Sequence, residues 1–253
     1  MGLPINMPGE VMLGALSRGL VRAAEAKLDR TPLIGTALSS AARANAAHVG
    51  TTFLVSGFGG STRGLGPIMR SLERDGLAAR AVQIPDGGLA SIHAGVAELD
   101  RAIAAVPTGP IHLAGHSKGG MVVQQWLADA TPEQLARVES LTLLSSSPTG
   151  QRLSPLLALQ SKLMEPITGP FSRSVAEAQF DNPVMAHIRD ADLASKVRGL
   201  SVVSEGDKLI KLPEAHWDGA ANLVLRGDDA PDHIGTLASG EAYDALVGNI
   251  LGR

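Results

Sequence analysis

An apolar run, a serine framed by glycines and a helix-forming stretch follow one another between residues 111 and 127. The run Ile111–Ala114 has the composition of a buried strand, and Met121–Leu127 that of a helix. Between them, residues 115–119 read Gly-His-Ser-Lys-Gly, the Gly-x-Ser-x-Gly pattern of a nucleophile elbow. A turn this tight leaves little room for a Cβ two residues before or after the serine, so glycine is needed at both places. The stretch therefore predicts a strand–turn–helix unit with Ser117 at the positive end of the helix.

Strand-like and helix-like segments alternate along the rest of the chain from residue 51. Predicted strands lie at residues 53–55, 81–84, 111–114, 141–144, 200–204 and 223–225. Predicted helices lie at 65–75, 91–106, 118–130 and 240–251. This alternation favours right-handed crossovers, and hence an α/β protein whose mainly parallel sheet of about six strands is covered by helices on both faces. Ligands bind such sheets at the carboxyl ends of the strands.

Two segments fall outside this alternation. Residues 1–48 form a helical extension, in which apolar residues follow helical spacing from Glu10 to Asp29, and we expect it to pack on the body. The domain itself is expected to span 49–253. Within it, residues from about 148 to 199 form an insertion beside the serine, which predicts a helical cap or lid.

Composition excludes several classes of protein and of site. The net charge of −3 and the 3% aromatic content do not favour a nucleic acid or an anionic membrane as a partner. The absence of cysteine excludes disulfides, thiolate metal sites and a cysteine nucleophile. The sequence contains no run of about 18 apolar residues, so no membrane span is predicted. The chain as numbered carries no secretory signal and is expected in the cytoplasm, although a secreted protein with its signal removed would look the same.

A serine hydroxyl needs a base within hydrogen-bond reach and an acid that orients the base. Where a nucleophile elbow is used in this way, the chain order is serine, then acid, then histidine. The strand-end turn after residue 204 offers Asp207, with Glu205 as the second choice. The loop after the last strand offers His233, whereas the rival His216 precedes that strand. We therefore expect Ser117, Asp207 and His233 to act together.

Two backbone N–H groups are needed to stabilise the oxyanion that develops in acyl transfer. The residue after the nucleophile supplies one, the N–H of Lys118. The loop after the first strand, residues 56–60, supplies the other, and the N–H of Phe58 is the best placed. We expect only the N–H of Lys118 to matter, with its aliphatic stem packed beside the helix.

The chain resembles the compact bacterial lipases and esterases of the α/β-hydrolase superfamily. The resemblance runs from about residue 52 to 251 and rests on residues 57–60, 115–120, 204–207 and 233–235. It implies the α/β-hydrolase fold, a triad of Ser117, Asp207 and His233, and an oxyanion hole made by the N–H groups of Phe58 and Lys118. The chain departs from the family at Ser56, where histidine is usual, and at Lys118, where an apolar residue is common.

These expectations predict a serine hydrolase that cleaves a small acyl ester or a lipid through an acyl-enzyme on Ser117, without metal or organic cofactor. The leucine- and methionine-rich residues 156–164 suggest an apolar acyl pocket under the cap. The acidic loop 228–232 favours a solvated turn over a calcium site. Three alternatives stay open: an acyltransferase, a thioesterase using the same residues, or a ligand-binding protein of slow or no turnover. Contact with a membrane surface stays open, although the sequence does not indicate it.

Overall fold

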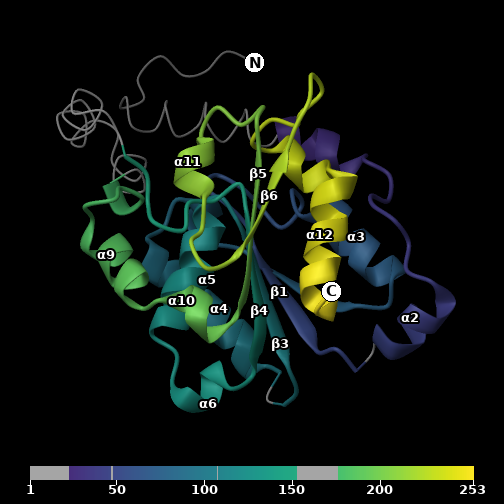
Figure 1. Ribbon diagram of the computed structural model, residues 1–253, viewed down its shortest axis with the longest axis horizontal. Coiled ribbons are helices and arrows are strands. Elements are labelled where there is room, and N and C mark those ends of the chain that lie inside the picture. The colour runs from purple at the N-terminus through teal and green to yellow at the C-terminus, as the bar shows by residue number, and fades with distance from the viewer. Residues whose placement is uncertain (1–22, 47, 107, 153–175) are drawn as a thin grey trace.

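The computed structural model describes residues 23–46, 48–106, 108–152 and 176–253 (Figure 1). Its sheet has six strands in the order β2-β1-β3-β4-β5-β6, and all neighbouring pairs are parallel. The strands are β1 (Thr51–Val55), β2 (Ala78–Val82), β3 (Ile111–His116), β4 (Val138–Leu144), β5 (Arg198–Ser204) and β6 (Ala221–Leu225). The predicted parallel sheet is confirmed, and the elbow follows an interior strand.

Strand β3 is buried along its whole length, as expected for a parallel strand covered on both faces. Its one polar side chain before the elbow, His112, is accommodated by hydrogen bonds. Its Nδ1 lies 2.8 Å from Ser140 Oγ, and its Nε2 lies 2.9 Å from the carbonyl oxygen of Val49. Buried polar groups are tolerated when they are paired in this way, so the elbow rises from a rigid strand.

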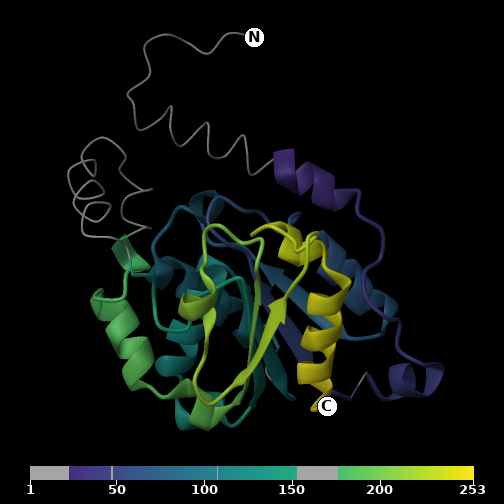
Figure 2. The ribbon, with the colours of Figure 1, turned by 45° about the horizontal axis from the view of Figure 1, so that its top comes forward.

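Helices cover both faces of the sheet (Figures 1 and 2). On one face, α4 (Ile92–Ala104) and α5 (Lys118–Ala128) bury their apolar sides, with α9 (Pro183–Asp190) and α10 (Leu193–Lys196) beside them. On the other face lie α3 (Gly66–Arg74) and α12 (Gly240–Leu251). The shorter helices are α2 (Ser40–Ala46), α6 (Pro132–Leu135), α11 (Leu212–Ala215) and the 3₁₀ turns η1 (Asp86–Gly88) and η2 (Gly235–Ala238).

The second strand begins and ends earlier than the sequence predicted. It was expected at residues 81–84, and it spans Ala78–Val82. Because β2 is an edge strand paired only with β1, its first residues are partly exposed and carry little apolar signal. Ile84 was predicted to belong to the strand because it is apolar. It is fully buried, but it lies in the loop that follows.

The part of the amino-terminal segment that the structure describes packs on the body. Residues 23–29 are helical, and Leu28 and Ile34 are buried in the apolar cluster that also contains α3 and α12 side chains. Figure 2 shows this purple helix above the end of the sheet where the last loops gather. The earlier part of the predicted helix, before residue 23, lies outside the described residues.

Much of the predicted cap also lies outside the described residues, which omit 153–175 and with them the stretch 156–164. The described end of the insertion forms α9 and α10, which pack on the α5 side of the sheet. A bridge between Gln151 and Gln179 joins the two described ends of the insertion. The cap itself stays a prediction.

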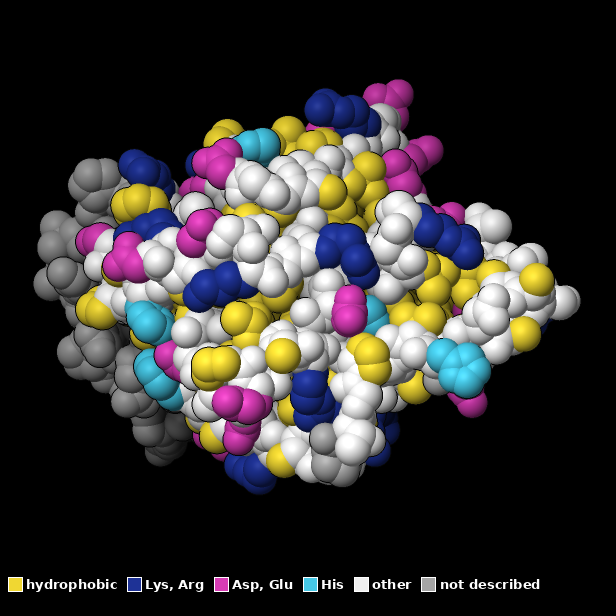
Figure 3. All heavy atoms as spheres, turned by 60° about the horizontal axis from the view of Figure 1, so that its bottom comes forward, with side chains coloured by type: hydrophobic (Ala, Val, Ile, Leu, Met, Phe, Trp, Pro, Cys, Tyr) yellow, Lys and Arg dark blue, Asp and Glu magenta, His cyan; other side chains and the backbone are white. Residues whose placement is uncertain are grey.

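Positive, negative and apolar side chains are interspersed on the face shown in Figure 3, without a large area of one charge. This agrees with the small net charge of −3. Among the described residues, no helix is both long and apolar enough to cross a membrane.

Candidate active site

Ser117 occupies the strained turn that the sequence predicted. Its φ of 54° and ψ of −125° are unfavourable for a residue with a side chain. A Cβ on Gly115 would lie 2.4 Å from the carbonyl of Gly119, and one on Gly119 would lie 2.3 Å from the carbonyl oxygen of Val55. Only glycine fits at either position, so the predicted steric reason for the motif is confirmed.

The predicted acid and base meet at the same edge of the sheet as Ser117. Asp207 follows β5 and His233 follows β6, each at a carboxyl end. The Nδ1 of His233 lies 2.8 Å from Oδ2 of Asp207, whose side chain is fully buried. Since a carboxylate accepts, Nδ1 carries the proton and Nε2 is left as an acceptor.

Backbone N–H groups hold the Asp207 carboxylate in place. Its Oδ1 accepts hydrogen bonds from the N–H groups of Leu209 and Ile210 at 2.8 and 2.9 Å. Burial alone would raise the pKa of Asp207, but the hydrogen bonds from His233 and these amides outweigh it, and the pKa lies below its ordinary value. The side chain is therefore an ionised, immobile acceptor for the imidazole.

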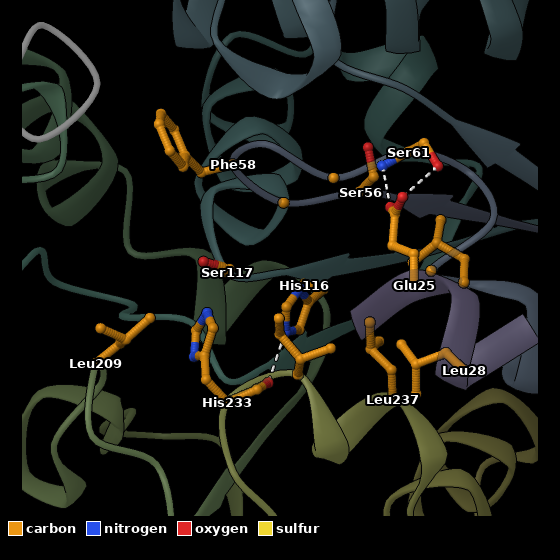
Figure 4. Close-up of a pocket in the computed structure, with 15 residues that line it drawn as sticks. Glu25, Leu28, Ser56, Phe58, Ser61, His116, Ser117, Leu209, His233 and Leu237 are labelled. Carbon is orange, nitrogen blue, oxygen red and sulfur yellow. Dashed lines mark hydrogen bonds between the residues drawn. The ribbon is translucent and has the colours of Figure 1, made fainter. Parts of the chain in front are cut away.

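Figure 4 shows the Ser117 hydroxyl next to the His233 imidazole, on the side of the ring away from the main chain. Both residues line one cavity. The structure thus brings together serine, imidazole and carboxylate in the order that acyl transfer requires. The catalytic roles of these residues remain predictions.

The two rival residues lie elsewhere. The carboxylate of Glu205 pairs with Arg226 at the surface. His216 pairs with Asp218, and its side chain is 61% exposed. Neither residue is among those that line the Ser117 cavity. This favours Asp207 as the acid and His233 as the base.

The loop after β1 lies against the elbow. A Cβ added to Gly57 would come within 3.0 Å of the Ser117 Cβ and of the His116 side chain. Phe58 follows at the mouth of the same cavity (Figure 4). The structure therefore places the loop of Phe58 against the elbow that carries Lys118, and the oxyanion hole itself remains a prediction.

The side chain of Lys118 does more than pack its stem, in contrast to our expectation. It is 5% exposed, its Nζ donates to the carbonyl oxygen of Ala90 at 2.5 Å, and Glu177 Oε2 lies 3.5 Å away. Burial lowers the pKa of Lys118, and Glu177 opposes that shift. The ammonium therefore joins the elbow to the described part of the insertion. The sequence signal for this role was the lysine itself, because the family that the chain resembles commonly has an apolar residue at this position.

Sequence analysis also missed the structural role of His116. Its Nε2 donates to the backbone carbonyl of His233 at 2.9 Å, and the two rings lie 4.8 Å apart. Burial, followed by repulsion from His233, lowers its pKa to about 3. A neutral imidazole thus supports the main chain of the predicted base.

The cavity in front of Ser117 has a volume of about 150 Å³. One side of it is apolar, formed by Leu28, Leu65, Ile234 and Leu237. Leu28 comes from the amino-terminal segment, whose Glu25 also lines the cavity (Figure 4). Residues that sequence analysis placed outside the domain therefore form part of its wall.

Comparison with known proteins identifies the fold. No protein-family model matches the chain, and no curated protein matches its sequence. Among solved structures, Aspergillus fumigatus lipase B matches with a TM-score of 0.61 and 16% identity over 78% of this chain and 52% of that one. A lipase-esterase related protein from Clostridium acetobutylicum gives 0.54 and 16% over 79% and 95%, and Paleococcus ferrophilus monoacylglycerol lipase 0.54 and 15% over 87% and 96%. The chain has the α/β-hydrolase fold.

Proposed function

We propose that the protein is a serine hydrolase that cleaves carboxylic esters through an acyl-enzyme on Ser117. The observation that carries this proposal is the Asp207–His233 hydrogen bond, with Ser117 on the strained elbow beside the same imidazole. Structural neighbours described as lipases support an ester as substrate.

In the proposed reaction, Oγ of Ser117 attacks the acyl carbon while Nε2 of His233 takes the hydroxyl proton. Asp207 keeps the imidazole in the required tautomer and stabilises its positive charge. The N–H groups of Phe58 and Lys118 stabilise the tetrahedral oxyanion, each worth about 3 kcal/mol. The protonated imidazole gives its proton to the leaving alcohol. Water, activated in turn by His233, then releases the acid and regenerates Ser117.

Cavity size favours a short acyl group. A dry cavity of about 150 Å³ holds a group of about the size of benzene, and the cavity at Ser117 has that volume. Its wall of Leu28, Leu65 and Leu237 suits an alkyl chain. We therefore propose esters with acyl groups of about four to six carbons as preferred substrates.

The test is a series of p-nitrophenyl esters from acetate to laurate, assayed with the wild type, Ser117→Ala and Asp207→Asn. We expect kcat/KM to peak at butanoate or hexanoate. Ser117→Ala should reduce turnover to the background rate, and Asp207→Asn should lower kcat by about 10⁴-fold because it favours the wrong tautomer.

Labelling with a fluorophosphonate provides a check that does not depend on the correct ester. The wild type should be labelled at Ser117, and Ser117→Ala should not. Labelling without turnover of any ester in the series would contradict ester hydrolysis and favour a thioesterase, an acyltransferase or a ligand-binding protein. Ester turnover that survives in Ser117→Ala would rule out the mechanism.

A further inference from the structure

The loop that carries the Phe58 N–H has little stiffness of its own. Residues 57–60 read Gly-Phe-Gly-Gly, and glycine has the greatest backbone freedom of any residue. The φ of Gly59 is 66°, and within the loop the N–H of Gly60 donates to the carbonyl of Gly57 at 3.2 Å. Catalysis by an oxyanion hole requires donors that are fixed before the reaction begins. The loop must therefore be held by its neighbours.

One neighbour holds the loop by close packing. A Cβ added to Gly88, in η1, would lie 2.5 Å from the carbonyl oxygen of Gly57 and 2.6 Å from the nitrogen of Gly59. This contact restrains one side of the loop.

Glu25 holds the opposite end of the loop. Its Oε1 accepts a short hydrogen bond from the N–H of Ser61, and its Oε2 accepts from Ser61 Oγ at 2.9 Å. The carboxylate also fits against the next turn, since a Cβ on Gly64 would lie 3.1 Å from Oε1. Both hydrogen bonds that Glu25 accepts from described residues thus come from the residue directly after the glycine turn (Figure 4).

The energetics make this contact a strong restraint. Glu25 is 6% exposed, and a buried carboxylate is costly unless it is hydrogen-bonded. Movement of Ser61 away from the helix would leave the carboxylate without these two donors. The hydrogen bonds that make the burial of Glu25 favourable therefore also hold the loop in place.

We propose that Glu25 is a positioning residue for the oxyanion hole: it acts through Ser61 to fix the Phe58 N–H. The inference rests on the proposed esterase function. Glu25 does not touch the reacting atoms. Its loss should weaken stabilisation of the transition state and leave binding of the ground-state ester nearly unchanged.

The central experiment compares Glu25→Ala with Glu25→Gln on the preferred p-nitrophenyl ester. Loss of the two hydrogen bonds between Glu25 and Ser61 in Glu25→Ala should lower kcat by about 10- to 100-fold, because small misplacements of catalytic groups cost about 100-fold. KM should change by less than about threefold. Glu25→Gln can accept from the Ser61 N–H and donate to Ser61 Oγ, so it should retain kcat within about threefold of the wild type.

Asp29→Asn is the matched control on the same helix. Asp29 is 57% exposed and lies 3.6 Å from Arg70, so this variant weakens the docking of the helix without touching the loop. Its kcat should equal that of the wild type. An alkylboronic acid, which mimics the tetrahedral intermediate, should bind Glu25→Ala more weakly by the same factor as the loss in kcat/KM.

Each outcome decides a separate point. A folded Glu25→Ala with wild-type kcat, or an equal loss in Asp29→Asn, overturns the positioning role. If Glu25→Ala does not fold, Ser61→Ala is the second variant: it removes the hydrogen bond from Ser61 Oγ to Glu25 at a partly exposed residue. An unchanged kcat in this variant overturns the role as well. The proposed function fails independently if the wild type neither hydrolyses an ester nor is labelled at Ser117.

Discussion

His116, directly before Ser117, contributes to the candidate site by staying neutral. The hydrogen bond to the carbonyl of His233 requires a proton on Nε2, and burial prevents a second proton from binding. The residue therefore links the elbow after β3 to the loop after β6 without a charge that would repel the imidazolium form of His233 required by the proposed reaction.

This neutrality makes the fold sensitive to acid. The folded-state pKa of His116 is about 3, against an ordinary value of 6.5. Between these values the unfolded chain binds more protons, so the free energy of unfolding falls as the pH falls from 6.5 towards 3. The pKa of His112 is also lowered, and it adds a change of the same sign. The lowered pKa of Asp207 adds a further loss only at lower pH, near 4 and below.

We predict that His116→Gln reduces this acid sensitivity. For a shift from 6.5 to about 3, the loss of stability between pH 7 and pH 5 should be smaller by about 2 kcal/mol in the variant. Urea unfolding at the two pH values measures this difference. His93→Gln, at an exposed position on α4, is the control and should lose as much stability as the wild type. Equal losses in His116→Gln and the wild type would contradict the prediction.

At the scale of elements, Lys118 joins three segments that are distant in sequence. It begins α5, its ammonium donates to Ala90 before α4, and it pairs with Glu177 within the insertion. Oε2 of Glu177 also accepts from the N–H of Ile92 in the first turn of α4. The pair therefore fixes the start of both helices relative to the elbow.

Glu177→Gln should lower the free energy of unfolding by about 2–3 kcal/mol, since it removes a negative charge beside a buried ammonium. Lys118→Met should cost less, about 1–2 kcal/mol, because Glu177 is 19% exposed and can be hydrated. The double variant should cost less than the sum of the two, which a double-mutant cycle in urea measures. Glu98→Gln, which breaks the exposed pair with Arg101, is the control and should cost under about 0.5 kcal/mol. Additive effects of Glu177→Gln and Lys118→Met would contradict the coupling.

The elements that sequence analysis predicted well are those whose signal is local. The interior strand β3 has an uninterrupted apolar run, and the elbow has a steric rule that fixes its glycines. Chain order and strand ends then led to Asp207 and His233, which the structure brings together. Their roles in catalysis stay predictions.

The contacts that sequence analysis missed depend on side chains that meet only in the folded chain. Nothing local to Lys118 indicates Glu177, and nothing in the amino-terminal segment indicates that Glu25 reaches Ser61. The edge strand β2 was misplaced for a related reason, because burial of Ile84 depends on packing around the loop and not on strand pairing. The periodicity of apolar residues indicates which side chains are buried, but it does not indicate which residues they contact.

At the scale of the whole molecule, one buried network joins the amino-terminal segment to α3 and α12. Asp75 accepts from the Tyr243 hydroxyl at 2.7 Å and from the Leu38 N–H at 3.0 Å, and it pairs with Arg74 at 2.7 Å. Burial raises the pKa of Tyr243. For Asp75, burial acts to raise the pKa, but the hydrogen bonds from Arg74 and Tyr243 outweigh it, and the pKa is lowered. The phenol thus stays protonated beside an ionised carboxylate.

We therefore expect the described amino-terminal segment and the domain to unfold as one unit. Leu28 and Ile34 share an apolar cluster with α3 and α12, whereas Trp126 and Trp217 report on the cluster across the sheet. In urea, the loss of ester turnover and the change in tryptophan fluorescence should share one midpoint. Tyr243→Phe, which leaves Asp75 short of one donor, should lower the free energy of unfolding by about 1–3 kcal/mol and shift both transitions together. If turnover were lost at a lower urea concentration than fluorescence, the segment would be releasing the cavity wall before the domain unfolds, and a single cooperative unit would be ruled out.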